Sequence, residues 1–432
     1  MISREYLKAL GYYIPQRFTL FLPEIKLPLA SDDKKGFTIF IHEYTHLLQN
    51  IFSLSGWTSF AYESLKYEAI LDHIKEEKAY NLPLYNKIKD KKINTSSNYK
   101  GYLFSMDKID RKSKIEALDN TNKLKSTIIS DFPVVENNKG IKIFSQFLVD
   151  GKIVNININY LVLIESMAYI VERHYGLSDI PSPDYPYNVI SILFSKTPLH
   201  AKLDKQIIIL YMSLQSSFPD ILFRNIYECV IDEKLYEIKN NDDFAIAIKK
   251  KLNYHFTNNC FSQIEMLKKV INQFCSIISI FPPAKHSANW ISEITSIFFN
   301  KICGDTLFYI RPIIERKGSS EIFGIFNNNY FLISDSNKKL STIKNRSTDD
   351  YGITFLSNLF HFIDYFLYYQ SDEKMNLCPM FSSCALEKFK DEKCIYSPYE
   401  KGSLLIEDAL CNYGVVAHMF FTHEIPVILP TR

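Results

Sequence analysis

Several features that would point to a function class are scarce or missing in this sequence. Glycine occurs only 13 times in 432 residues, and no glycine-rich loop of the kind that holds a phosphate group is present. The 50 Lys and Arg residues nearly balance the 48 Asp and Glu residues, so the net charge of +2 gives no general attraction to nucleic acid or to an anionic membrane. No internal repeat is visible. These absences disfavour phosphate-loop proteins, repeat proteins and strongly basic nucleic-acid binders.

Long hydrophobic runs are missing as well. Even the apolar stretch Phe360–Tyr369 is interrupted by His361 and Asp364, so we expect no membrane span and no intramembrane protease. The first residues contain no apolar segment followed by small side chains, which argues against a signal peptide. The expected location is the cytoplasm.

The lysine-rich run Lys87–Lys92 resembles a nucleic-acid patch only superficially. It contains no arginine, and Asp90 interrupts it. A solvated surface is the simpler interpretation, and we predict no nucleic-acid binding from it.

The eight cysteines show no tight C-x-x-C pair, which weakens any prediction of a cysteine metal site. Those in the helical middle of the chain, Cys229, Cys260, Cys275 and Cys303, are most simply core residues. The later four are Cys378, Cys384, Cys394 and Cys411. For this later group, a structural zinc or an iron–sulfur cluster and free thiols are both open interpretations.

One motif does point to a specific chemistry. His42-Glu43-Tyr44-Thr45-His46 is an H-E-x-x-H pentad inside a segment with helical periodicity. On a helix, His42 and His46 lie about 40° apart around the axis, so both imidazoles can bind one zinc ion. Glu43 lies about 100° from His42 and can act as a base for a water molecule at the open coordination position.

The apolar residues around the pentad favour one buried side of this helix. They lie opposite the two histidines and are Phe37, Phe40, Ile41, Tyr44, Leu47, Leu48 and Ile51. We therefore expect His42, His46 and Gln49 to face a cleft. The alternative is a helix with two exposed histidines and no metal.

A hydrolytic zinc site needs a third protein ligand, and Glu165 is the best candidate. It lies in a second helical segment, residues 161–172, on the side opposite the apolar residues. The alternative is a surface helix with ordinary solvated carboxylates.

Glu172 follows Glu165 by two helical turns on the same side. It is a possible hydrogen-bond partner for a metal ligand rather than a ligand itself. The sequence Glu172-Arg173-His174 also has the pattern of a solvated helix end, with Gly176 as the stop.

H-E-Y-T-H followed downstream by I-E-S-M-A-Y resembles the gluzincin metallopeptidases, over about residues 15–55 and 155–178. The resemblance implies His42, His46 and Glu165 as zinc ligands and Glu43 as general base and acid. The interval of 119 residues between His46 and Glu165 (165 minus 46) implies a long insert. Tyr169 stands where the family often has an Asp, with Glu172 as a possible substitute. No clear counterpart of the family's oxyanion-stabilising Tyr or His is apparent.

The expected fold is mainly α with a small β component (α+β), built as a zincin-like catalytic core with a long insert and an additional helical domain. Asp150-Gly151 between alternating apolar residues predicts a β-hairpin that leads into the Glu165 helix. We divide the chain into a metallopeptidase region at 1–180 with the insert at about 85–130, a helical bundle at 181–316, and a C-terminal region at 317–432 with the cysteine-bearing tail.

The predicted function is that of a zinc-dependent peptidase, with Zn²⁺ as cofactor and a protein or peptide as substrate. In this hypothesis Glu43 activates a zinc-bound water for attack on a peptide bond. H-E-x-x-H fixes the metal chemistry and not the bond that is cleaved, so a zinc hydrolase of a non-peptide amide is an alternative. A non-enzymatic or regulatory zinc-binding protein is another.

Overall fold

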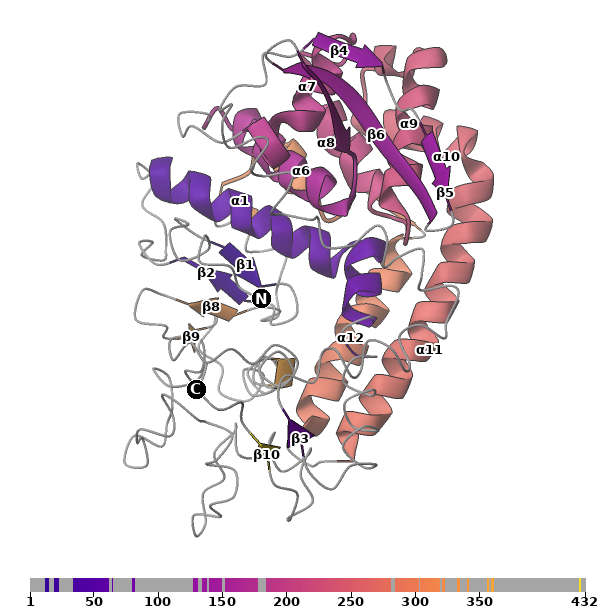
Figure 1. The fold of residues 1–432 in the computed structure, drawn as a ribbon. Helices are drawn as coiled ribbons and strands as arrows, with labels where there is room; N and C mark the ends of the chain where they lie inside the picture. The colour runs from indigo at the N-terminus through magenta and orange to yellow at the C-terminus, as the bar shows by residue number, and fades with distance from the viewer. Residues whose placement is uncertain are drawn as a thin grey trace.

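The structure is a computed structural model, and Figure 1 shows its fold. The residues that it describes are 12–14, 19–22, 34–61, 64, 80–81, 127–130, 134–137, 140–149, 152–177, 184–280, 284–302, 304–318, 321–322, 332–334, 340–341, 356, 359–360 and 427–428. Most of the predicted insert, Cys303 and the four later cysteines lie outside these residues. The described residues are mainly helical with short strands, which confirms the mainly α prediction. The zincin-like core and the division into three regions stay predictions.

Two helices position the predicted ligands. α1 (Lys34–Ile51) contains the H-E-x-x-H pentad, and α6 (Tyr160–His174) contains Glu165. They pack against each other although more than a hundred residues separate them in the chain. The predicted apolar side of α1 is buried as expected, apart from the half-buried Phe37.

A small sheet flanks α1. Its strand order is β1 (Tyr12–Ile14), β2 (Thr19–Phe21), β8 (Leu332–Ser334) and β9 (Leu340–Ser341). β1 and β2 are antiparallel and contact α1, whereas β2 and β8 are parallel. The Asn50 side chain donates a 2.8 Å hydrogen bond to the Tyr13 hydroxyl and so ties the end of α1 to β1.

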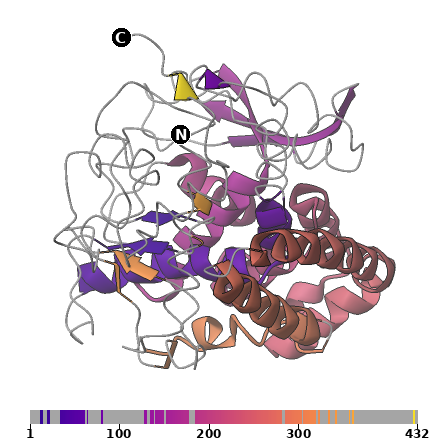
Figure 2. The ribbon, with the colours of Figure 1, turned by 90° about the horizontal axis from the view of Figure 1, so that it is seen from below.

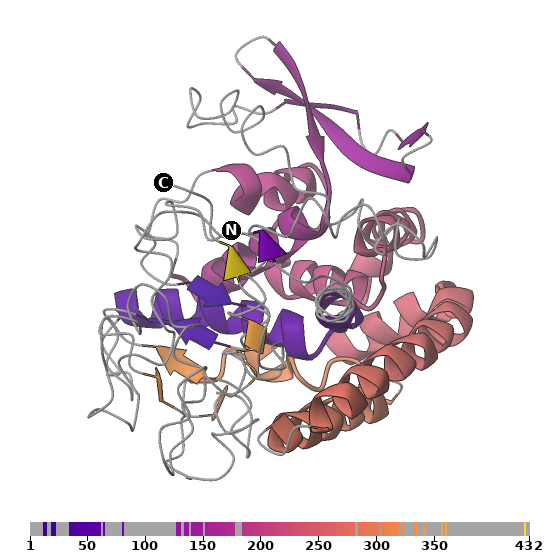
Figure 3. The same ribbon diagram turned by 60° about the horizontal axis from the view of Figure 1, so that its bottom comes forward.

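A second sheet leads into α6. It contains β4 (Thr127–Ser130), β5 (Val134–Asn137), β6 (Gly140–Val149) and β7 (Lys152–Asn157). β6 and β7 form an antiparallel hairpin in which Val149 pairs with Lys152, so the hairpin predicted at Asp150-Gly151 is confirmed. β3 (Tyr80–Asn81) pairs with β10 (Val427–Ile428) in a separate two-stranded sheet. Figure 3 shows the β4–β7 sheet at one end of the molecule.

Residues 181–316, predicted as a helical bundle, are mostly helical where the structure describes them, and this part is called the helical block below. Its α-helices are α7 (Val189–Ser195), α8 (Leu203–Ser213), α9 (Pro219–Asp232), α10 (Asn241–Lys251), α11 (Cys260–Ser279) and α12 (Lys285–Ile302), followed by α13 (Arg311–Ile314). Shorter helical turns are η3 (Asp184–Asn188), η4 (Leu235–Glu237) and η5 (His255–Asn259). The long helices α11 and α12 run side by side (Figure 2).

One buried apolar cluster connects these parts. It runs from Tyr13 in β1 through α1, α6 and the helical block to Phe360. Burial of each large apolar side chain stabilises the fold by about 1.5–3 kcal/mol, so this shared core holds α1 and α6 in fixed positions. Among the described residues, no helix combines the length and the apolar character needed to cross a bilayer.

Candidate metal centre

The ends of α6 are set by its own sequence. The Asn159 side chain caps the helix by accepting a 3.0 Å hydrogen bond from the Val162 backbone N–H. At the other end Gly176 has φ of +73°, and the bonds Leu177 N–H to Glu172 C=O and Gly176 N–H to Arg173 C=O form a Schellman motif. The predicted stop at Gly176 is therefore confirmed. These two ends define the helix that carries Glu165.

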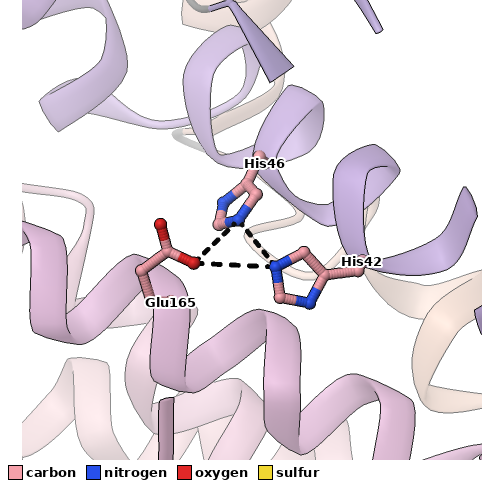
Figure 4. Close-up of side chains that lie close together, drawn as sticks. All are labelled: His42, His46 and Glu165. Carbon is pink, nitrogen blue, oxygen red and sulfur yellow. Dashed lines mark hydrogen bonds and ion pairs between the residues drawn. The ribbon is translucent and has the colours of Figure 1, made fainter. Parts of the chain in front are cut away.

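Three side chains from the two helices converge on one point. Nε2 of His46 lies 3.2 Å from Nε2 of His42 and 3.3 Å from Oε2 of Glu165, and Nε2 of His42 lies 3.6 Å from the same oxygen. Figure 4 shows the three side chains pointing toward one another from α1 and α6. The structure thus brings together the three residues that the sequence suggested as ligands. These three side chains lie close enough to one another that they could hold one metal ion.

The other nitrogen of each histidine is occupied. Nδ1 of His42 donates to Oε1 of Glu172, and Nδ1 of His46 donates 2.8 Å to Oε1 of Gln49. Gln49 in turn donates 3.0 Å from Nε2 to the backbone carbonyl of Ile164. Each imidazole is therefore held with Nε2 toward Glu165, an arrangement that metal-binding histidines commonly need.

The interpretation of Glu172-Arg173-His174 as a solvated helix end is wrong. Glu172 is 5% exposed and His174 is 6% exposed. His174 donates from Nε2 to the carbonyl of Ile314 at 2.9 Å. Both side chains are covered because α6 ends against α1 and the segment around residue 314, a tertiary contact that the local polar pattern does not encode.

Charges inside the site are strongly coupled. Burial by itself would lower the pKa of His42 and of His46, but the neighbouring carboxylates outweigh burial and raise both pKa values. Burial alone would raise the pKa of Glu165, yet the two imidazoles hold it well below its usual range. A metal ion would compete with protons for these histidines, because only a neutral imidazole binds a metal.

Glu43 is buried beside this group, with 7% of its surface exposed. Burial raises its pKa, the two histidines oppose that rise, and Glu165 and Glu172 add to it. A carboxylate with a raised pKa is a better proton acceptor near neutral pH. Its position on α1 next to His42 is the one that the sequence suggested.

Tyr187 is a residue near the site that the sequence did not reveal. It lies in the π-helical turn η3, and its ring centre is 5.8 Å from that of His42. Ser166, the neighbour of Glu165, donates 2.9 Å to the carbonyl of Pro186 and so holds this turn on α6. Irregular π turns are frequent at functional sites, but nothing in the local sequence marks this one.

Comparisons with known proteins identified no relative of this chain. No known protein family, curated protein or solved structure matches this chain. The gluzincin resemblance therefore stays a prediction that depends on the pentad and on Glu165.

Proposed function

We propose that this protein is a zinc-dependent hydrolase of the gluzincin type that cleaves peptide bonds in a protein or peptide substrate. The observation that carries the proposal is the convergence of two imidazole nitrogens and one carboxylate oxygen, 3.2–3.6 Å apart, with both remaining imidazole nitrogens bonded elsewhere.

The spacing of these atoms supports zinc as the ion. Tetrahedral ligands at about 2.1 Å from a zinc ion are about 3.4 Å from one another. Two imidazoles and one carboxylate are also a ligand set that zinc hydrolases use, whereas Mg²⁺ and Ca²⁺ prefer oxygen ligands alone. Three protein ligands leave a fourth position for water or substrate.

The residues of the chain would divide the work of hydrolysis. Zinc, when bound, supplies a Lewis acid that polarises a carbonyl and makes water more acidic. Glu43 takes the proton from the attacking water and returns it to the leaving amine. Glu172 and Gln49 keep the two imidazoles in the orientation that binds the ion.

Glu43→Gln tests this assignment directly. The amide cannot accept the proton, so hydrolysis of casein and of a peptide panel should fall by about 10²–10⁴-fold. Zinc content, measured by elemental analysis, should equal that of the wild type because Glu43 is not a ligand. His46→Ala should lose both zinc and hydrolysis.

Other outcomes would redirect the proposal. A Glu43→Gln protein with wild-type hydrolysis would remove Glu43 from the mechanism. A wild-type protein that binds zinc but cleaves only small amides, or nothing, would contradict the peptidase assignment and leave the metal site standing.

A further inference from the structure

Gln49 occupies a position between the two ligand-bearing helices. It lies three residues after His46 on α1 and is only 1% exposed. Its amide oxygen is 2.8 Å from Nδ1 of His46, and its amide nitrogen is 3.0 Å from the carbonyl oxygen of Ile164, the residue before Glu165. The side chain thus links one ligand to the backbone beside another.

The hydrogen-bond chemistry of this link determines the tautomer of His46. A backbone carbonyl only accepts, so the NH₂ group of Gln49 must face Ile164. Oε1 of Gln49 then faces His46, and an amide oxygen also only accepts. Nδ1 of His46 must therefore carry a proton. In the neutral imidazole, the form that binds a metal, the lone pair is then on Nε2, the atom that lies near Glu165 and His42.

We propose that Gln49 is a positioning residue for the metal centre: it holds His46 as the Nδ1–H tautomer and fixes the distance between the His46 and Glu165 helices. This inference rests on the proposed zinc site. The two histidines then have different hydrogen-bond partners. His42 is bonded to the Glu172 carboxylate of α6, and His46 is bonded to the Gln49 amide of α1.

Only an amide of this length satisfies both contacts. Glutamate at position 49 would accept from His46 but would set a carboxylate oxygen against the carbonyl oxygen of Ile164, with no proton between them. Methionine would fill the same volume and form neither hydrogen bond. Comparing the two variants therefore distinguishes the hydrogen bond to His46 from the hydrogen bond that links α1 to Ile164 of α6.

Gln206 offers a matched control. It lies on α8 and is equally buried, at 1% exposed. Its Nε2 donates to the backbone carbonyls of Leu199 and His200 at 2.8 and 3.1 Å, and neither bond involves a predicted metal ligand. Gln206→Met removes two buried amide hydrogen bonds, as Gln49→Met does, without removing a bond to a predicted ligand.

The experiment measures zinc affinity by competition with a chelator in wild type, Gln49→Met, Gln49→Glu and Gln206→Met. We expect Gln49→Met to bind zinc about 10–100-fold more weakly than wild type, and Gln206→Met to stay within about threefold. Gln49→Glu should lie between wild type and Gln49→Met because it keeps the acceptor for His46. In nuclear magnetic resonance spectra of the zinc-loaded proteins, a slowly exchanging His46 Nδ1–H proton should be present in wild type and Gln206→Met and absent in Gln49→Met.

The outcomes separate this inference from the proposed function. If the wild type binds zinc and Gln49→Met binds it equally well with the Nδ1–H signal retained, the role of Gln49 is overturned and the metal site stands. If Gln49→Met does not fold, wild-type affinity in Gln49→Glu, together with wild-type affinity and an unchanged signal in Gln49→Leu, would overturn it in the same way. If the wild type binds no zinc, both the site and the role of Gln49 fall.

Discussion

At the scale of single residues, hydrogen bonds orient the two histidines of the proposed metal site. Glu172 and Gln49 occupy the Nδ1 atoms, so the two Nε2 atoms are the ones that meet Glu165. The sequence predicted His42 and His46 as ligands because helix geometry alone brings the two histidines of H-E-x-x-H together, and it predicted Glu165 from the polar side of a second helical segment. It could not predict that Gln49 reaches Ile164, because that contact depends on how α1 and α6 dock.

Glu172→Gln tests the support of His42. The amide keeps an acceptor but loses the negative charge that makes the imidazole a stronger donor to a metal. Zinc affinity, measured by chelator competition, should fall by about tenfold or more. The exposed Glu237→Gln is the control and should bind zinc as the wild type does. Equal affinity in the Glu172 and Glu237 variants would contradict the role given to this carboxylate.

At the scale of elements, the corner that follows α1, residues 52–57, keeps α1 against the helical block. The backbone N–H of Ser55 donates to the carbonyl of Leu214, and the Trp57 indole donates to the carbonyl of Ile51. Gly56 packs directly on α1, since a Cβ atom at this residue would lie 2.1 Å from the carbonyl oxygen of Asn50. The corner therefore requires glycine.

Gly56→Ala should destabilise the protein by about 3 kcal/mol, because the backbone must move to admit the methyl group. Urea unfolding followed by circular dichroism measures this change. Gly318→Ala is the control, as a Cβ atom there meets nothing within 4 Å. Identical midpoints for the two variants would show that the corner tolerates a side chain.

Local patterns predicted the elements better than they predicted which elements pack against one another. Asp150-Gly151 fixed the hairpin because a two-residue turn needs those residue types. The apolar side of α1 followed from its 3.6-residue period. The stop of α6 at Gly176 was predicted correctly, but the exposure of its last turn was not, because Glu172 and His174 are polar yet buried by segments that are distant in the sequence.

At the scale of the whole molecule, long-range contacts lay beyond prediction from the sequence. β2 pairs in parallel with β8, more than 300 residues later in the chain, and no local pattern specifies that pairing. Residues of α1, α6 and the helical block share one core, so loss of any part lowers the stability of all.

The stability of the molecule should depend on pH through Asp220, at the start of α9. Asp220 is 5% exposed, and burial raises its pKa to about 6 from an ordinary value of 3.8. The folded state thus binds the proton more tightly than the unfolded state. The free energy of unfolding should fall by up to about 3 kcal/mol as the pH rises from about 4 to above 6.

Asp220→Asn should remove this dependence. At pH 7.5 the variant should be more stable than wild type by about 2–3 kcal/mol, whereas the two should be nearly equal at pH 4. Urea unfolding at both pH values measures the difference, with the exposed Asp232→Asn as the control. A variant that is less stable than wild type at pH 7.5 would show that the carboxylate is needed in its charged form.

The central claim is that His42, His46 and Glu165 bind one zinc ion together, and metal analysis tests it most directly. After dialysis against buffer with trace zinc, the wild type should retain about one zinc per chain, and Glu165→Ala should retain far less because only two ligands remain. Wild-type protein without stoichiometric zinc, or Glu165→Ala with the same zinc content and affinity as wild type, would contradict the claim.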